Sequence, residues 1–202
     1  MTLPRVTADI LRTMLGDLVD DAWFKPKYRR RGRLVHAAAH LLAQGRQIEP
    51  AWWDQSSGDR PDDLVLHEEC RPYVNGAEKA LAELDLKVLE VEKEVTNSLE
   101  SYLGHYDWVA EQGDYSLFVV DLKCGNIPAP NSLMEYMHRY QLAAYKLALA
   151  VQHKWMVRRA ALYLPGDGSY KFVTYSDARD MNDFIILARA FHIRRKASGH
   201  QD

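Results

Sequence analysis

The spacing of hydrophobic residues divides the chain near residue 87. Before that point, apolar residues recur every three or four positions, which predicts helices. These helices are expected over residues 7–21, 34–45 and about 61–85. Thr7 is the expected N-cap of the first helix, Gly45 ends the second, and Pro61 opens the third. The third helix is expected to be interrupted at Asn75-Gly76.

After residue 87, short segments rich in Val, Leu, Tyr and Phe alternate with polar turns, which is typical of strands. Strands are expected over residues 88–96, 101–110, 115–123, 161–165 and 170–175. A helix over 132–152 separates the third strand from the fourth, and a last helix begins near residue 177. The helix over 132–152 has an apolar stripe suited to packing on a sheet, formed by Met137, Tyr140, Ala144, Leu147 and Val151.

This order of elements predicts an α/β or α+β fold, in which helices flank one small mixed sheet. The length of 202 residues fits a single domain, 1–202. Within it, residues 1–87 form a mainly helical portion, 88–175 contain the sheet and its helix, and 176–202 form a C-terminal helix and tail.

Composition excludes several classes of protein. The formal net charge of −2 gives no overall attraction to a polyanion, so any nucleic-acid surface must be a local patch. The two cysteines, Cys70 and Cys124, are too few for a disulfide framework and fit a reducing cytoplasm. We expect no signal peptide and no membrane span, because no apolar segment is long enough for either.

Two opposite charges end an otherwise apolar strand in the segment YSLFVVDLKCGN. Alternation along a strand places Asp121 and Lys123 on one face with Val119, and places Phe118 and Val120 on the other. A salt bridge at the edge of the strand is the simplest interpretation of the two charges.

The preceding strand carries another acid among apolar residues. Asp107 is expected to share a face with His105, while Tyr106 and Trp108 take the opposite face. Inward carboxylates on two adjacent strands make an oxygen-rich pocket that a cation can neutralise. Mg²⁺ keeps water ligands that can become nucleophiles, and a nearby lysine can orient such a water. The pattern of an acid followed by acid-x-lysine therefore predicts metal-dependent hydrolysis of phosphodiesters.

The motifs together resemble those of the PD-(D/E)xK nucleases, specifically their RecB-like exonuclease branch. That branch carries a His on an early helix, G-x-x-D on a strand, D/E-x-K on the next strand, and Q-x-x-x-Y on a helix. The matching segments are GRLVHAAAH with His36, GHYD with Gly104 and Asp107, VVDLK with Asp121 and Lys123, and QLAAY with Gln141 and Tyr145. The resemblance covers about residues 32–175 and implies a restriction-endonuclease-like core.

The resemblance also implies a role for each motif residue. A divalent metal, Mg²⁺ or Mn²⁺, would be bound by His36, Asp107, Asp121 and the main-chain carbonyl of Leu122. The catalytic group would consist of Asp107, Asp121, Lys123, Gln141 and Tyr145, with Lys123 serving the attacking water and His138 beside the cleft. Glu94 is a further candidate ligand, or else belongs to a solvated face with Glu90 and Glu92.

The sequence departs from the family at Cys124, where many members carry Thr, and the role of this thiol is open. Branches with an iron–sulfur cluster need four cysteines, so no cluster is expected in a chain with two. Helicase motifs are absent from the sequence, which predicts a stand-alone nuclease.

Other features have simpler explanations. HAAAH places His36 and His40 one turn apart but lacks the Glu of the zinc hydrolases, and His40 is assigned to packing. A cluster of six basic residues is either a solvated charge run or a surface that binds DNA phosphates. Its members are Lys25, Lys27, Arg29, Arg30, Arg31 and Arg33. Trp52 and Trp53 could stack on bases, although packing is the simpler explanation.

These observations predict a cytoplasmic, metal-dependent DNA nuclease, with exonuclease action on linear double-stranded DNA favoured over endonuclease action. By resemblance, its setting is phage or mobile-element recombination or repair in a bacterial cell, beside a single-strand annealing protein, with a homo-oligomer as one arrangement. Two alternatives remain. One is a structure-specific or RNA-directed endonuclease of the same fold, and the other is a non-catalytic nucleic-acid-binding relative.

Overall fold

Within the part of the chain that the structure describes, the strands form one five-stranded sheet in the order β1-β2-β3-β4-β5. This is seen in a computed structural model that describes residues 3–16, 26–48, 61–113 and 116–199. The strands are β1 (Leu86–Asn97), β2 (Tyr102–Gln112), β3 (Ser116–Cys124), β4 (Arg158–Leu164) and β5 (Lys171–Tyr175). Only β3 and β4 pair in parallel, while the other neighbours are antiparallel. The sheet is therefore mixed, as the sequence predicts.

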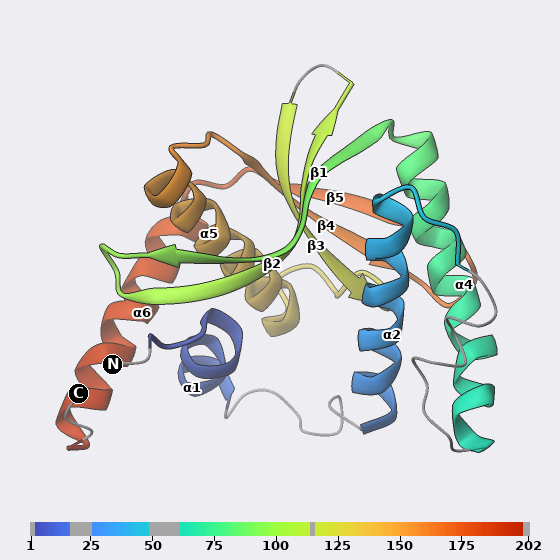
Figure 1. Cartoon of the computed structure of the whole chain (residues 1–202). Helices are drawn as coiled ribbons and strands as arrows, with labels where there is room; N and C mark the ends of the chain where they lie inside the picture. The colour runs from blue at the N-terminus through green and yellow to red at the C-terminus, as the bar shows by residue number, and fades with distance from the viewer. Residues whose placement is uncertain (1–2, 17–25, 49–60, 114–115, 200–202) are drawn as a thin grey trace.

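Helices cover both faces of this sheet (Figure 1). They are η1 (Val6–Leu11), α1 (Arg12–Leu15), α2 (Pro26–Ala43), α4 (Pro61–Glu83), α5 (Leu133–His153) and α6 (Arg179–Ala197). The first core lies between the sheet and α2 with α4, and the second between the sheet and η1, α5 and α6. The predicted α/β architecture, a sheet flanked by helices, is confirmed. In the described ranges, no helix combines the length and the apolar character needed to cross a bilayer.

Strand β3 separates these cores by simple alternation. Phe118 and Val120 are buried in the core under α2 and α4, whereas Val119 is buried in the core under α5 and α6. This confirms the expected faces of β3, and it directs Asp121 and Lys123 toward α5.

Strands β1 and β2 break their alternation where Glu92 meets Asp107. The ladder pairs Val91 with Trp108 and Lys93 with Tyr106, so it skips the two acids, and Glu92 has a left-handed backbone with φ 46°. Past this kink, Tyr106 packs in the core of α5 and α6, while Trp108 packs in the core of α2 and α4. The expectation that Tyr106 and Trp108 share a face was therefore wrong, because the strand rotates between them.

Several helix boundaries also differ from expectation. The first helical segment begins at Val6 after Arg5, not at Thr7, and the Asp9 carboxylate accepts a hydrogen bond from the Arg5 N–H. Helix α4 runs unbroken through Asn75-Gly76. Gly76 instead allows a close approach of another segment, since a Cβ there would lie 2.4 Å from the Ser169 carbonyl oxygen. Most of the basic cluster lies within α2, whose first residue is Pro26.

The side of α5 that faces the sheet is more polar than the apolar stripe predicted for this helix. Tyr140 and Leu147 are only half-buried, whereas Gln141 and Tyr145 are exposed by 9% and 3%. Ser132 caps the helix by accepting a hydrogen bond from the Glu135 N–H. Two polar side chains are thus held inside the second core, facing β3.

Some predictions fall outside the described residues. Trp52, Trp53 and Lys25 lie there, so their proposed roles stay predictions. The division of the single domain into the portions 1–87, 88–175 and 176–202 is likewise a prediction that the sheet and helices do not test.

Candidate active site

Strands β2 and β3 separate at one end, and the first acid of the site, Asp107, lies in the fork between them. Pairing between the two strands ends at Trp108 and Val120, after which β2 diverges. The Leu122 N–H, which has no strand partner there, donates instead to Oδ2 of Asp107 at 2.6 Å. Because the N–H and C=O of one strand residue point to the same edge, the Leu122 carbonyl also faces the fork. Asp107 is therefore anchored to the sheet through a backbone hydrogen bond.

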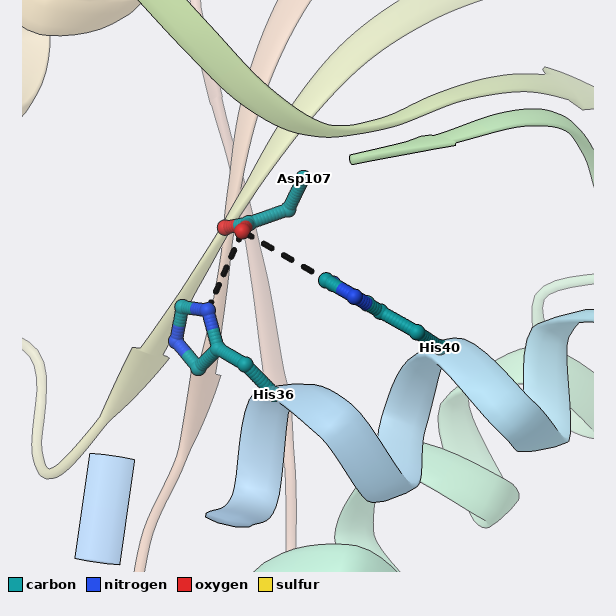
Figure 2. A group of neighbouring side chains, drawn as sticks. All are labelled: His36, His40 and Asp107. Atoms are coloured by element: carbon teal, nitrogen blue, oxygen red, sulfur yellow. Dashed lines mark hydrogen bonds and ion pairs between the residues drawn. The ribbon is translucent and has the colours of Figure 1, made fainter. Parts of the chain in front are cut away.

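Two histidines of α2 approach the other oxygen of Asp107. His36 Nδ1 lies 3.0 Å from Oδ1, and His40 Nε2 lies 3.8 Å from the same oxygen. Figure 2 shows both rings rising from consecutive turns of α2, which is the placement that an i, i+4 spacing gives. One ligand atom from each of these residues fits within 4.8 Å of the others, so the group could hold a metal ion.

The kink at Glu92 supplies a partner to the second histidine. His40 Nδ1 lies 3.2 Å from Glu92 Oε2, and the histidine is only 6% exposed. The expected assignment of His40 to packing was therefore incomplete. Its signal in the sequence was its position one turn after His36, but nothing in the alternation of Glu90, Glu92 and Glu94 singled out Glu92.

Glu94, the further candidate ligand, lies apart from this group. Its Oε2 is 3.7 Å from His105 Nε2, and its side chain is 57% exposed. Both residues are beyond the kink, on the exposed part of the β1–β2 ribbon. The structure therefore does not bring Glu94 together with Asp107.

A second cluster joins β3 to α5. Lys123 Nζ lies 2.5 Å from Asp121 Oδ2 and donates to Gln141 Oε1 at 2.8 Å. The Gln141 amide in turn donates to Asp121 Oδ1 at 2.9 Å and to the Tyr145 hydroxyl at 2.8 Å. The structure thus gathers four of the predicted catalytic residues into one hydrogen-bonded group.

Gly104 makes room for this group. A Cβ at this position would lie 2.5 Å from Cε1 of Tyr145 and 2.8 Å from its Cδ1. The G-x-x-D motif therefore has two separate functions in the fold, since its glycine admits the Tyr145 ring and its aspartate faces α2.

His138, one turn before Gln141, takes a different partner. Its Nδ1 lies 2.8 Å from the Tyr163 hydroxyl, which is 2.9 Å from the Tyr175 hydroxyl. Burial, together with the positive charge of Lys123, lowers the pKa of His138 to about 2. This histidine is therefore neutral at physiological pH and acts as a hydrogen-bonding group beside the lysine.

The charges of the site depend strongly on one another. Burial opposes a charge on His36, but the Asp107 carboxylate and its hydrogen bond outweigh burial and raise the pKa of His36 well above its usual value. Burial alone would raise the pKa of Asp107, but the charge and hydrogen bond of His36, together with the Leu122 N–H, hold it well below its usual range. Burial raises the pKa of Asp121, with Lys123 opposing the rise and Asp107 adding to it. Keeping both carboxylates ionised thus favours a cation between them.

Cys124, whose role was open, lies beside the first cluster, which consists of His36, His40 and Asp107. The nearby Cys124 side chain adds to the rise in the pKa of His36. The residue is half-buried against the core of α2 and α4. The residue after Lys123 thus contributes to the surroundings of His36, a role that no pattern in the sequence indicates.

The basic cluster begins the helix that carries the histidines. The Arg31 guanidinium packs over the rings of Tyr28 and Tyr73, at 5.1 and 4.6 Å from their centroids. Arg29 and Arg33 are exposed. Arg31 therefore has a structural contact of its own, joining α2 to α4, in addition to any role in binding.

Comparisons with known proteins place the sequence in a family. The sequence profile of the PD-(D/E)XK nuclease superfamily matches residues 14–192. Among solved structures, a candidate exonuclease from Eubacterium rectale shares 10% identity, covering 85% of this chain and 69% of that one, with a TM-score of 0.47. The protein SSO0001 also shares 10% identity, covering 80% of this chain and 85% of that one, with a TM-score of 0.38. No curated protein matches the chain.

Proposed function

Because the chain belongs to the PD-(D/E)XK nuclease superfamily, we propose that it is a divalent-metal-dependent deoxyribonuclease that degrades linear double-stranded DNA from its ends. The observation that carries this proposal is the junction at Leu122. This residue links Asp107 through its N–H to the neighbouring Asp121 and Lys123. An acid, a second acid and a lysine are thereby fixed around one fork in the sheet.

The residues around the fork suit a divalent cation. Asp107 and Asp121 provide carboxylates, His36 provides an imidazole, and the Leu122 carbonyl faces the same edge. His40 Nε2 is buried and has no hydrogen bond among the described residues, so this nitrogen could also bind the cation. A bound Mg²⁺ or Mn²⁺ would lower the pKa of a coordinated water and polarise the scissile phosphate.

Lys123 serves the attacking water in this proposal. Its ammonium is held between Asp121 and Gln141, so it cannot swing away from the fork. A fixed positive charge there can orient the nucleophile and offset the charge that develops on the phosphoryl oxygens. Gln141 and Tyr145 act as positioning residues, since they hold the lysine and Asp121 through the chain of hydrogen bonds.

The substrate assignment rests on two further features. The basic start of α2 lies on the helix that carries His36, and its exposed arginines can contact DNA phosphates. Exonuclease action follows from the resemblance of the motif set to the RecB-like branch. The same resemblance suggests the phage or mobile-element setting, the annealing partner, the cytoplasmic location and a homo-oligomer.

The test compares end-labelled linear DNA with closed circular DNA, with Mn²⁺ or Mg²⁺ and with chelator. We expect degradation of the linear form alone, its loss in chelator, and its loss in Lys123→Ala. Lys171→Ala, at an exposed lysine on β5, is the matched control and should retain activity. Cleavage of the circular DNA would indicate an endonuclease. If neither DNA substrate is degraded with Mn²⁺ or with Mg²⁺, the nuclease proposal fails and the alternative is a non-catalytic nucleic-acid-binding relative.

A further inference from the structure

His40 is a buried ring with one nitrogen unpaired. The residue is 6% exposed, and its Nε2 has no hydrogen bond among the residues that the structure describes. That nitrogen points toward Asp107 Oδ1, 3.8 Å away, too far for a hydrogen bond. Buried polar atoms without partners are uncommon in folded proteins, so this nitrogen needs an explanation.

The partner on the other side of the ring fixes its chemistry. Nδ1 lies 3.2 Å from Glu92 Oε2, and an ionised carboxylate only accepts hydrogen bonds. In the neutral ring whose Nδ1 carries the proton toward Glu92, Nε2 is a bare lone pair. A lone pair and a carboxylate oxygen then face each other, an arrangement that a cation between them would stabilise. This order of carboxylate, imidazole and metal is the one that orients histidine ligands.

The backbone at Glu92 is shaped for this contact. Glu92 adopts φ 46° although it has a side chain, and the β1–β2 ladder skips it and Asp107. Such a conformation is uncommon for a residue other than Gly, Asn or Asp, and it concentrates at functional sites. Here it breaks the alternation of β1 at the residue whose carboxylate contacts His40 Nδ1.

We propose that His40, oriented by Glu92, is a metal ligand through Nε2 and makes the site select first-row transition metals, Mn²⁺ among them, over Mg²⁺. His36 and Asp107 complete a set of two imidazoles and one carboxylate within 4.8 Å. Mg²⁺ prefers oxygen ligands and near-ideal octahedral geometry, whereas imidazole suits the transition metals. The metal preference deepens the proposed nuclease function, but the binding of metal to these residues does not depend on cleavage.

The experiment measures metal binding directly. The full chain, freed of metal by chelation, is titrated with MnCl₂ and separately with MgCl₂ by isothermal titration calorimetry, and CoCl₂ is followed by visible absorption. We expect Mn²⁺ to bind at least about tenfold more tightly than Mg²⁺, and Co²⁺ to give bands of an imidazole-ligated ion. His40→Ala should lose about 10- to 100-fold in Mn²⁺ affinity. The ratio of Mn²⁺ affinity to Mg²⁺ affinity should therefore fall in this variant.

Glu92→Gln provides a variant whose folding is not in question, since that side chain is 69% exposed. It should weaken Mn²⁺ binding by about tenfold through His40. Glu94→Gln is the matched control, two residues along the same strand, and should bind Mn²⁺ like the wild type. Unchanged Mn²⁺ affinity in both Glu92→Gln and a folded His40→Ala, or equal affinity for the two metals, overturns the proposal.

DNA cleavage, assayed in parallel, separates this inference from the proposed function. If Mn²⁺ binds through His40 but no DNA substrate is degraded, the metal assignment stands and the nuclease proposal fails. If linear DNA is degraded while His40→Ala binds Mn²⁺ normally, the nuclease proposal stands and the role of His40 fails.

Discussion

Gly104→Ala is expected to damage the site without touching a charged residue. The added methyl carbon would lie 2.5 Å from Tyr145 Cε1, well inside van der Waals contact, and the ring is 3% exposed. Tyr145 cannot move outward, because its hydroxyl is bonded to Gln141 and its ring is packed in the core of α5 and α6. Either the ring or strand β2 must shift.

The expected size of the effect follows from this overpacking. Forcing an extra methyl into a packed core costs about 1–3 kcal/mol. In a protein of this length each kcal/mol lowers Tm by about 2–4 °C, so the variant should melt about 2–12 °C below the wild type. A displacement of about 1 Å passed through Gln141 to Lys123 would lower the cleavage rate by about 100-fold.

Thermal unfolding followed by circular dichroism, together with cleavage of end-labelled DNA, measures both effects. Gly32→Ala is the control, because no atom lies within 4 Å of its added Cβ in α2. This change should stabilise the helix by about 0.5–1 kcal/mol. In a Tyr145→Leu background the penalty of Gly104→Ala should shrink, because the ring that causes the clash is gone. A Gly104→Ala protein with wild-type Tm and activity would refute this account.

Three further predictions concern charge and burial. In chelator, His36→Gln should lower the free energy of unfolding more at pH 6 than at pH 9, measured by urea denaturation. The ion pair between protonated His36 and Asp107 stabilises the fold fully at pH values below the ordinary pKa of histidine. This stabilisation is lost as the pH rises through the raised pKa of His36. Asp180→Ala should cost about 3–5 kcal/mol in the same assay, because it removes the carboxylate that lies 2.8 Å from the buried Arg159 guanidinium; equal stability would contradict this. Burial raises the pKa of Cys70 to about 12, so iodoacetamide at pH 8 should leave Cys70 unmodified until urea is added, as read by mass spectrometry.

The sequence predicts β3 and its cluster well because both depend on local periodicity. Strand alternation alone places Asp121 and Lys123 on one face, and helical spacing places Gln141 and Tyr145 on one side of α5. The fold then needs only to pack that helix across that strand. The contacts found between Lys123, Gln141 and Asp121 follow from these two periodicities.

The first cluster depends on a break in the strand alternation of β1 and β2, and no sequence pattern predicts this break. Glu92 and Asp107 stand opposite each other in a ribbon that kinks there, so strand alternation wrongly placed Tyr106 on the same face as Trp108. A left-handed Glu has no sequence signal, in contrast to a glycine at a turn. The contact between His40 and Glu92 could not be predicted from either segment alone, since it depends on tertiary packing.

The two oxygens of Asp107 have separate partners, and this division bears on calcium. Oδ2 is engaged by the Leu122 N–H at 2.6 Å, so Oδ1 is the oxygen directed at the two imidazoles. A carboxylate fastened to the sheet in this way binds an ion through one oxygen. Ca²⁺ favours six to eight oxygen ligands and often takes carboxylates through both oxygens. The hydrogen bond between the Leu122 N–H and Asp107 therefore also disfavours Ca²⁺ at this site.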